Sequence, residues 1–338
     1  MPQHSDRSRA HVPKALPTRL IADIPVGADE PQWLVESLWA ASGVGIIGGL
    51  PKSLKTWLAA DLAVSVASGT PALGRFAVSS QGPVLVFVAE GGSRALRARF
   101  ESVAKARAVS LAGLQVHEID VPALYLDEHE HWADLRKTIE ELRPRLLILD
   151  PFVRIIARVD ENSAQEVSRV LGSLRALQRE FDLAVLLVHH LRKSPSPRLG
   201  QRLRGSGDFA AWYDSGLYLV KQGDDDLILY AEHRDAPALS PLRVRLELSG
   251  APHLVVVEDL AGHSSQPDSL GTCPRGGRGK DGGEACGGGR AGSEAQVDHG
   301  RSSFAGPFCL AHPSGRRLRL PPSTDLPRYW AAIGSPRP

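Results

Sequence analysis

Residues 44–56 read VGIIGGLPKSLKT, and the residue types in this stretch suit the binding of phosphate. An apolar run ends in glycines, Lys55 and Thr56 follow, and an alanine- and leucine-rich helical pattern begins directly after them. Unpaired backbone N–H groups at a helix start, together with the helix dipole, favour an anion there. The stretch therefore predicts that Lys55 reaches the β- and γ-phosphates of a nucleotide, and that the Thr56 hydroxyl binds Mg²⁺.

The match to the phosphate-loop pattern G-x-x-x-x-G-K-[ST] has one departure. Gly49, Lys55 and Thr56 are in place, whereas Leu54 occupies the second glycine position. A leucine is strained if this position needs a positive φ. An ordinary glycine-rich turn is the alternative, but the strand-to-helix context favours a phosphate loop. The predicted nucleotide-contacting residues are Gly49, Pro51, Lys52, Ser53, Leu54, Lys55, Thr56 and Trp57.

Two carboxylates follow apolar runs that have the pattern of buried strands. Asp150 closes residues 146–150 and Glu90 follows residues 83–89. At the carboxyl edge of a parallel sheet, Asp150 would hold Mg²⁺ directly or through water. Glu90, next to two glycines, would orient and deprotonate an attacking water. The simpler alternatives are a capping aspartate and a solvated glutamate.

Further polar candidates lie downstream. His189 and His190 end an apolar run, and strand alternation allows one of them to face the phosphates. We expect this to be His190, which could contact the γ-phosphate. No ligands at suitable spacing support a metal role for it. Arg234 is predicted to reach the γ-phosphate of a neighbouring subunit, the alternative being a surface arginine.

Residues 192–208 form a basic segment with glycines, prolines and serines. Such a loop suits the backbone of single-stranded nucleic acid, although a solvated surface loop has the same composition. The candidate nucleic-acid contacts are Arg192, Lys193, Arg198, Arg202 and Arg204.

The surrounding pattern predicts the elements that position these residues. Apolar runs at 83–89, 146–150 and 183–188 alternate with helical patterns over 57–68, 94–109, 131–142 and from Ser163 to about Phe181. The pattern also predicts a further short strand over residues 116–120 and an apolar approach to the first strand over 33–41. This order predicts an α/β fold with a mostly parallel sheet covered by helices on both faces. Strand patterns at 216–220, 227–231, 244–248 and 254–257 predict an antiparallel C-terminal extension.

Composition sets the boundaries of this core. We predict a flexible lead-in over residues 1–30, one folded domain over 31–260, and a disordered Gly/Pro/Arg-rich tail over 261–338. The three cysteines all lie in the tail, with irregular gaps that argue against a zinc site. A net charge of +2 imposes no global preference for nucleic acid. No apolar run approaches a membrane span and no secretory signal is evident, so we expect a cytoplasmic protein.

In order and spacing, several stretches resemble those of RecA-like ATPases, in the branch of the hexameric replicative helicases of the RepA and DnaB type. These are GGLPKSLKTW, VLVFVAEGG, RLLILDP, VLLVHHLRK, RGSGD and AEHRDAP, which together span residues 33–248. The resemblance implies that the predicted folded domain is a RecA-like ATPase domain, which hydrolyses ATP with Mg²⁺ at the subunit interfaces of a ring, a hexamer, acting on single-stranded DNA. It implies Walker A roles for Lys55 and Thr56, a Walker B role for Asp150 and that of catalytic glutamate for Glu90.

The resemblance extends to the downstream residues. His190 would be the sensor, residues 192–204 the DNA-binding loop of the channel, and Arg234 the trans-acting arginine. Glu232 stands where the helicase pattern often has lysine, which weakens the case for a full arginine–lysine finger. The leading interpretation is a replication ATPase or helicase of a plasmid, phage or mobile element. The alternatives are an ATP-dependent oligomeric switch that moves no DNA, and an inactive ATPase.

Overall fold

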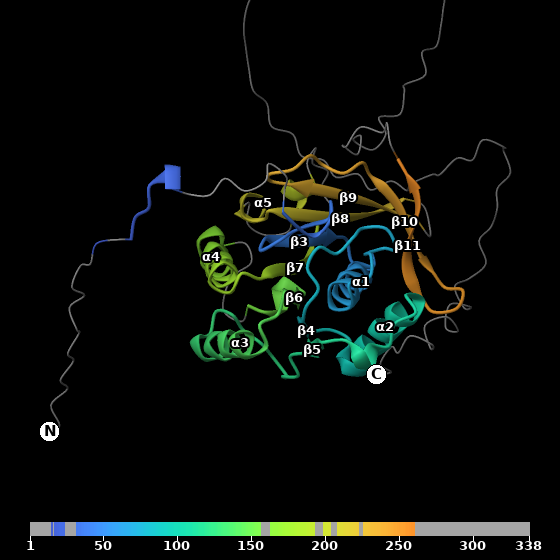
Figure 1. The fold of residues 1–338 in the computed structure, drawn as a ribbon, viewed down its shortest axis with the longest axis horizontal. Helices are drawn as coiled ribbons and strands as arrows, with labels where there is room; N and C mark the ends of the chain where they lie inside the picture. The colour runs from blue at the N-terminus through green and yellow to red at the C-terminus, as the bar shows by residue number, and fades with distance from the viewer. Residues whose placement is uncertain are drawn as a thin grey trace, which may run out of the picture. The chain divides into compact units, whose positions relative to one another are not determined.

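The computed structural model describes residues 15, 17–23, 32–156, 163–192, 199–203, 208–222 and 226–260 (Figure 1). All of these residues belong to one compact unit, Met1–Ser269. They form a nine-stranded sheet in the order β11-β10-β9-β8-β3-β7-β6-β4-β5. Its strands are β3 (Val44–Gly49), β4 (Val84–Val88), β5 (Val116–Glu118), β6 (Leu146–Asp150), β7 (Ala184–His190), β8 (Ser215–Gln222), β9 (Asp226–His233), β10 (Leu242–Glu247) and β11 (His253–Asp259).

The sheet has a parallel part and an antiparallel part. The strands from β8 through β5 pair in parallel, whereas β9, β10 and β11 extend the β8 edge antiparallel. In the parallel part β3, β6 and nearly all of β7 are buried along their lengths. Continuous apolar strands of this kind require cover on both faces of a sheet. The predicted fold class is therefore confirmed, including the antiparallel C-terminal extension.

Helices cover the two faces, as Figure 1 shows. On one face lie α1 (Lys55–Ser68) and α2 (Gly92–Ala106), and on the other α3 (His129–Leu142), α4 (Ala164–Phe181) and the short α5 (Asp208–Trp212). Each face has its own core: the first joins α1 and α2 to alternate strand residues such as Ile148. The second joins α3, α4 and α5 to the residues between them, such as Leu149. The alternation along β6 thus divides its side chains between two separate cores.

The observed helices differ from the predicted ones mainly at their ends. α1 and α2 each begin two residues before the predicted start, inside the loops that precede them, and α2 ends at Ala106. Ser163 is the N-cap of α4 as predicted, but its side chain makes no capping hydrogen bond. Helix ends depend on the backbone of the flanking loops, which sequence periodicity does not report.

Two regions have more structure than the sequence indicates. Residues 33–41 form a two-stranded hairpin, β1 (Trp33–Val35) with β2 (Trp39–Ala40), whose apolar side chains join the α1 core. Within the segment predicted to be a loop, residues 199–203 contain the 3₁₀ helix Leu199–Arg202, and α5 begins at Asp208. Leu199 is buried there, and so is Phe209 in α5. These apolar residues are few and widely spaced, so they produce no helical period in the sequence.

Among the described residues, no helix combines the length and the apolar composition needed to cross a membrane.

Candidate active site

Four predicted site residues lie at the carboxyl ends of neighbouring parallel strands. β3 ends at Gly49, which pairs in register with His190 at the end of β7. β6 ends at Asp150, which pairs with the last residue of β4, and Glu90 follows that strand two residues later. α1 begins with Lys55, in the loop that leaves β3. The two carboxylates predicted for the site therefore come from adjacent strands, at the edge where the phosphate loop begins.

The loop between β3 and α1 has an unusual backbone. Lys52 and Leu54 both have positive φ, 63° and 61°. A Cβ on Gly49 would overlap the Oγ of Ser53 and lie 3.1 Å from the Leu219 carbonyl oxygen, so a side chain at the end of β3 would displace the buried Ser53 hydroxyl. Ser53 is buried, and its Oγ has no hydrogen-bond partner among the described residues. A buried hydroxyl without a partner, inside a loop that needs glycine for close approach, fits a loop that wraps a ligand.

Lys55 is buried at 7% exposure, and its Nζ donates to the carbonyl of Leu50, 2.9 Å away. Burial lowers the pKa of the Lys55 ammonium, while the charges of Asp150 and Glu90 act in the opposite direction. A cation that is desolvated in this way, with one carbonyl as its hydrogen-bond acceptor among the described residues, favours a further anionic partner.

Asp150 is also buried, and its Oδ2 accepts a hydrogen bond of 2.7 Å from the Thr56 hydroxyl. Burial raises the pKa of Asp150, whereas the Thr56 hydrogen bond and then Lys55 lower it. A hydroxyl and a carboxylate in contact provide the oxygen ligands that Mg²⁺ prefers, and Mg²⁺ commonly takes few protein ligands. The described residues contain no cluster of three or more metal-ligating side chains. The pair therefore fits Mg²⁺ bound together with substrate phosphates.

Leu54 adopts the left-handed conformation in which a leucine is strained. It precedes α1 with φ 61° and ψ 22°, and its side chain packs against the α1 core. A left-handed residue with a side chain costs about 1–2 kcal/mol. The remaining loop residues predicted to contact nucleotide are arranged around it: Pro51 and Lys52 are exposed, and Trp57 is half-buried on α1.

We expect Leu54→Gly to be more stable than Leu54→Ala by about 1 kcal/mol, because both lose the leucine packing and only glycine relieves the strain. Urea denaturation of both variants measures this difference. At a residue with negative φ, the alanine variant would be the more stable of the two, since glycine increases the conformational entropy of the unfolded chain. Equal stability of the two variants would show that the backbone at Leu54 is unstrained.

Glu90 has a partner that the sequence did not predict. Its Oε1 lies 3.1 Å from the Nε of Arg154, which belongs to the 3₁₀ helix Phe152–Arg154 directly after β6. Both side chains are more than half exposed. Glu90 is therefore accessible to water at the same edge as Lys55 and Asp150.

The two histidines lie on opposite faces of the sheet. The His189 ring is buried, stacks on Phe209 at 4.5 Å between ring centroids and meets Phe152 edge-on. His190 is half-buried and in register with Gly49. Strand alternation thus leaves His190 as the histidine beside the phosphate loop.

The sequence interpretation missed Arg99 on α2. Its Nε is buried and has no hydrogen-bond partner among the described residues. Burial is the main influence on the pKa of Asp150, but the positive charge of Arg99 also acts on that carboxyl and lowers its pKa. The available signal was a charged residue in the apolar stripe of α2, between Leu96 and Val103.

Arg234 lies at the edge of the sheet where the parallel strand β3 begins, opposite the edge where the phosphate loop begins. Its backbone N–H donates to the carbonyl of Asp214, whose Oδ2 in turn accepts from the N–H of Val44 at the start of β3. The phosphate loop follows the far end of that strand, some 17–20 Å away at about 3.3 Å per residue. Within one chain, Arg234 is therefore remote from Lys55.

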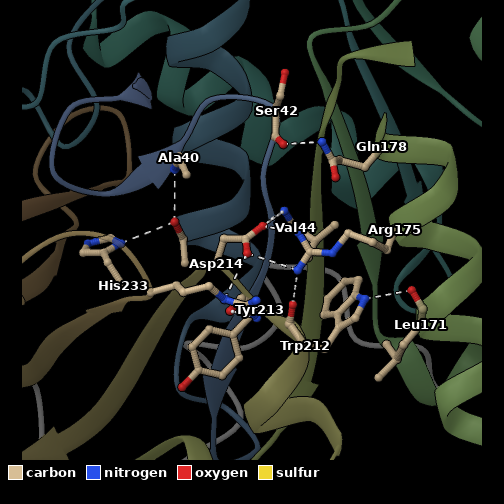
Figure 2. A network of polar contacts seen from close by, with 12 residues as sticks. Ala40, Ser42, Val44, Leu171, Arg175, Gln178, Trp212, Tyr213, Asp214 and His233 are labelled. Atoms are coloured by element: carbon tan, nitrogen blue, oxygen red, sulfur yellow. Dashed lines mark hydrogen bonds and ion pairs between the residues drawn. The ribbon is translucent and has the colours of Figure 1, made fainter. Parts of the chain in front are cut away.

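A polar network holds Arg234 at this edge. The guanidinium donates to the carbonyls of Ala211 (2.6 Å) and Tyr213 (3.2 Å) and lies 3.3 Å from Asp214 Oδ1. Figure 2 shows Asp214 at the centre of the network, where Arg175 from α4 also binds it. In this chain Arg234 has a structural role, and its action on a neighbouring copy stays a prediction.

Only part of the predicted DNA-binding loop falls within the described residues. Arg192 and Arg202 are brought side by side, because the Arg192 N–H donates to the Arg202 carbonyl (2.6 Å) next to a bridge between Leu191 and Leu203. Lys193, Arg198 and Arg204 lie outside the described residues.

A cavity of about 470 Å³ borders the phosphate loop on the side of the antiparallel strands. Lys52 and Leu54 contribute one wall, and Lys221, Asp226 and Leu246 from β8, β9 and β10 contribute the other. The two left-handed residues of the loop thus both face this space. It has room for a small organic group beside the loop.

The comparisons with known proteins agree with this geometry. A family model described as an AAA domain matches residues 10–196, which is more than half of the chain. The chain belongs to this AAA-domain family. No curated protein sequence matches it.

Among solved structures, one that is described as an ATPase domain has the same fold as this AAA-domain chain. Its TM-score is 0.50 at 15% identity, over 65% of this chain and 87% of that domain. The RadB recombinase has a TM-score of 0.48 at 18% identity, over 64% and 92% of the two chains. A DnaB-like replicative helicase has 0.49 at 15%, over 64% of this chain and 58% of that one. The RecA-like resemblance inferred from the sequence motifs is confirmed by the family and the fold.

Proposed function

We propose that this chain is an Mg²⁺-dependent ATPase whose hydrolysis is coupled to single-stranded DNA in the replication of a plasmid, phage or mobile element. The observation that carries the proposal is the convergence at one edge of the sheet of a buried lysine, a hydroxyl–carboxylate pair and an accessible glutamate. Membership of the AAA-domain family and the fold shared with a solved ATPase domain support the ATPase part.

Each residue has a role that follows from its surroundings. The buried Lys55 ammonium would bind the β- and γ-phosphates, whose charge offsets its desolvation. The loop N–H groups before α1 would complete the phosphate site. Thr56 and Asp150 would hold Mg²⁺, which supplies charge neutralisation at the phosphate oxygens. The cavity beside Leu54 would take the nucleoside.

Glu90 would accept the proton of the attacking water. Its exposed carboxylate follows β4, next to the strand that ends in Asp150, so a water between Glu90 and the γ-phosphate is geometrically accessible. Arg99, with its buried Nε lacking a partner among the described residues, is a further candidate for phosphate contact. With Glu90 as the proton acceptor, the proposed reaction needs no other general base.

Coupling to DNA would use the neighbouring strand. His190, in register with Gly49, would contact the γ-phosphate, and the segment that follows β7 carries the basic residues. A change at the phosphates would then reach Arg192 over two residues of backbone. Action of Arg234 on a neighbouring active site would require a ring, and we propose a hexamer.

We expect single-stranded DNA to raise the ATPase rate severalfold, because DNA bound after β7 would shift His190 at the end of the same strand. Steady-state hydrolysis measured with and without an oligonucleotide, alongside particle mass with and without nucleotide, tests this. Hydrolysis and assembly that ignore DNA would favour an ATP-dependent oligomeric switch. Failure to bind ATP would indicate an inactive ATPase.

A further inference from the structure

The residue that pairs with Glu90 has a geometry suited to a second partner. Arg154 contacts Glu90 through Nε alone, at 3.1 Å. Among the described residues its side chain makes no other hydrogen bond or ion pair, so both terminal amino groups are without a protein partner there. The guanidinium therefore presents an unused pair of donors at 62% exposure.

This ion pair contributes little to the stability of the fold. Glu90 and Arg154 are both more than half exposed, and ion pairs of this kind have small effects on folding. A single contact through Nε does, however, fix the direction in which the planar guanidinium points. The contact with Glu90 therefore serves to orient the Arg154 guanidinium.

The contact lies at the proposed phosphate site. Arg154 ends the short 3₁₀ helix directly after Asp150. Glu90 is close enough for its charge to act on the pKa of Lys55, which burial lowers, and on that of Asp150, which burial raises. Arg154 is thus bonded to one of the two carboxylates whose charges act on Lys55, and it follows the strand that ends in the other.

We propose that Arg154 binds the γ-phosphate of the nucleotide held by Lys55, with Glu90 orienting the guanidinium through Nε. A guanidinium binds phosphate oxygens bidentately through two parallel donors, and the two unused amino groups supply them. One arginine beside the γ-phosphate in the same chain also stabilises the charge that develops there during phosphoryl transfer. The inference rests on the proposed ATPase function.

The test compares Arg154→Gln and Arg154→Lys with wild type. Arg136→Gln is the matched control, because it removes another exposed arginine–glutamate pair, that of Arg136 on α3 with Glu180 on α4. Titration calorimetry measures the dissociation constants of each protein for the β,γ-imido analogue of ATP and for ADP, both in the presence of Mg²⁺. Turnover of ATP is measured separately.

We expect Arg154→Gln to weaken the ATP analogue about tenfold and ADP less than twofold, and to lower turnover about 100-fold. Arg154→Lys should be intermediate, because it retains the charge without the planar fork. Equal weakening of both nucleotides, or wild-type behaviour of Arg154→Gln, would overturn the inference. If Lys55→Ala still hydrolyses ATP, the proposed function fails; if only Arg154→Gln is unaffected, this inference alone fails.

Discussion

Replacement of Lys55 by alanine is expected to abolish ATP turnover, with a loss of at least about 1,000-fold, and to weaken ATP binding about 10- to 100-fold. The Lys55 ammonium is buried and, among the described residues, has only the Leu50 carbonyl as a hydrogen-bond acceptor. A charge-assisted hydrogen bond is worth about 1.5–3 kcal/mol, and about 1.4 kcal/mol is tenfold in affinity. The turnover loss is larger because charge at the γ-phosphate oxygens grows in the transition state.

Steady-state hydrolysis and nucleotide titration measure the two effects separately. Lys137→Ala is the control, because Lys137 is an exposed lysine of α3 whose ion pair with Glu141 lies along that helix. Thermal unfolding should change little, because the gain from removing a cation whose burial opposes folding, as its lowered pKa indicates, offsets the lost hydrogen bond to the Leu50 carbonyl. Undiminished hydrolysis by a folded Lys55→Ala protein would refute the phosphate-loop assignment.

Glu90→Gln is expected to lower turnover about 100- to 10,000-fold while ATP still binds. Glutamine keeps the size and the hydrogen-bonding carbonyl of the side chain but cannot accept the proton of the attacking water. The binding residues Lys55, Thr56 and Asp150 are unchanged. The ion pair with Arg154 becomes a hydrogen bond from the guanidinium to an uncharged amide oxygen, so some loss of orientation there is also expected.

Single-turnover hydrolysis with a parallel binding measurement separates the two steps. Glu101→Gln is the control, since it removes an exposed carboxylate of α2 that pairs with Arg97 on the same helix. If Glu90→Gln binds ATP and hydrolyses it at the wild-type rate, the general base is another group. Loss of binding and hydrolysis together would instead assign Glu90 a role in nucleotide binding.

Short-range features of the sequence predicted the elements of this site. The apolar runs before Gly49 and Asp150 become buried parallel strands because such strands require continuous apolar residues. The departure at Leu54 raised the question of a strained leucine, and the positive φ of that residue in the structure answers it. Alternation along β7 correctly separated His189 from His190.

Other features depend on residues far apart in the chain. Arg154 meets Glu90 only because β4 and β6 are neighbours in the sheet, across 64 positions of sequence. The short α5 follows from burial of Phe209 and Trp212 against α4 and the second core, which no local period indicates. Arg99 is a second example. The sequence shows that it lies in the apolar stripe of α2, but only the fold shows that its charge acts on Asp150, where it lowers a pKa that burial raises.

The sequence by itself determined the glycine-rich loop between the first parallel strand and its helix, and the alternation of strands and helices, because periodicity and turn residues are local. Tertiary structure alone decided that Arg154 meets Glu90 at the strand ends, and that Arg234 lies at the opposite edge, bound to Asp214. The physical reason is that strand order and side-chain pairing arise from long-range packing of the two cores, which local sequence does not encode.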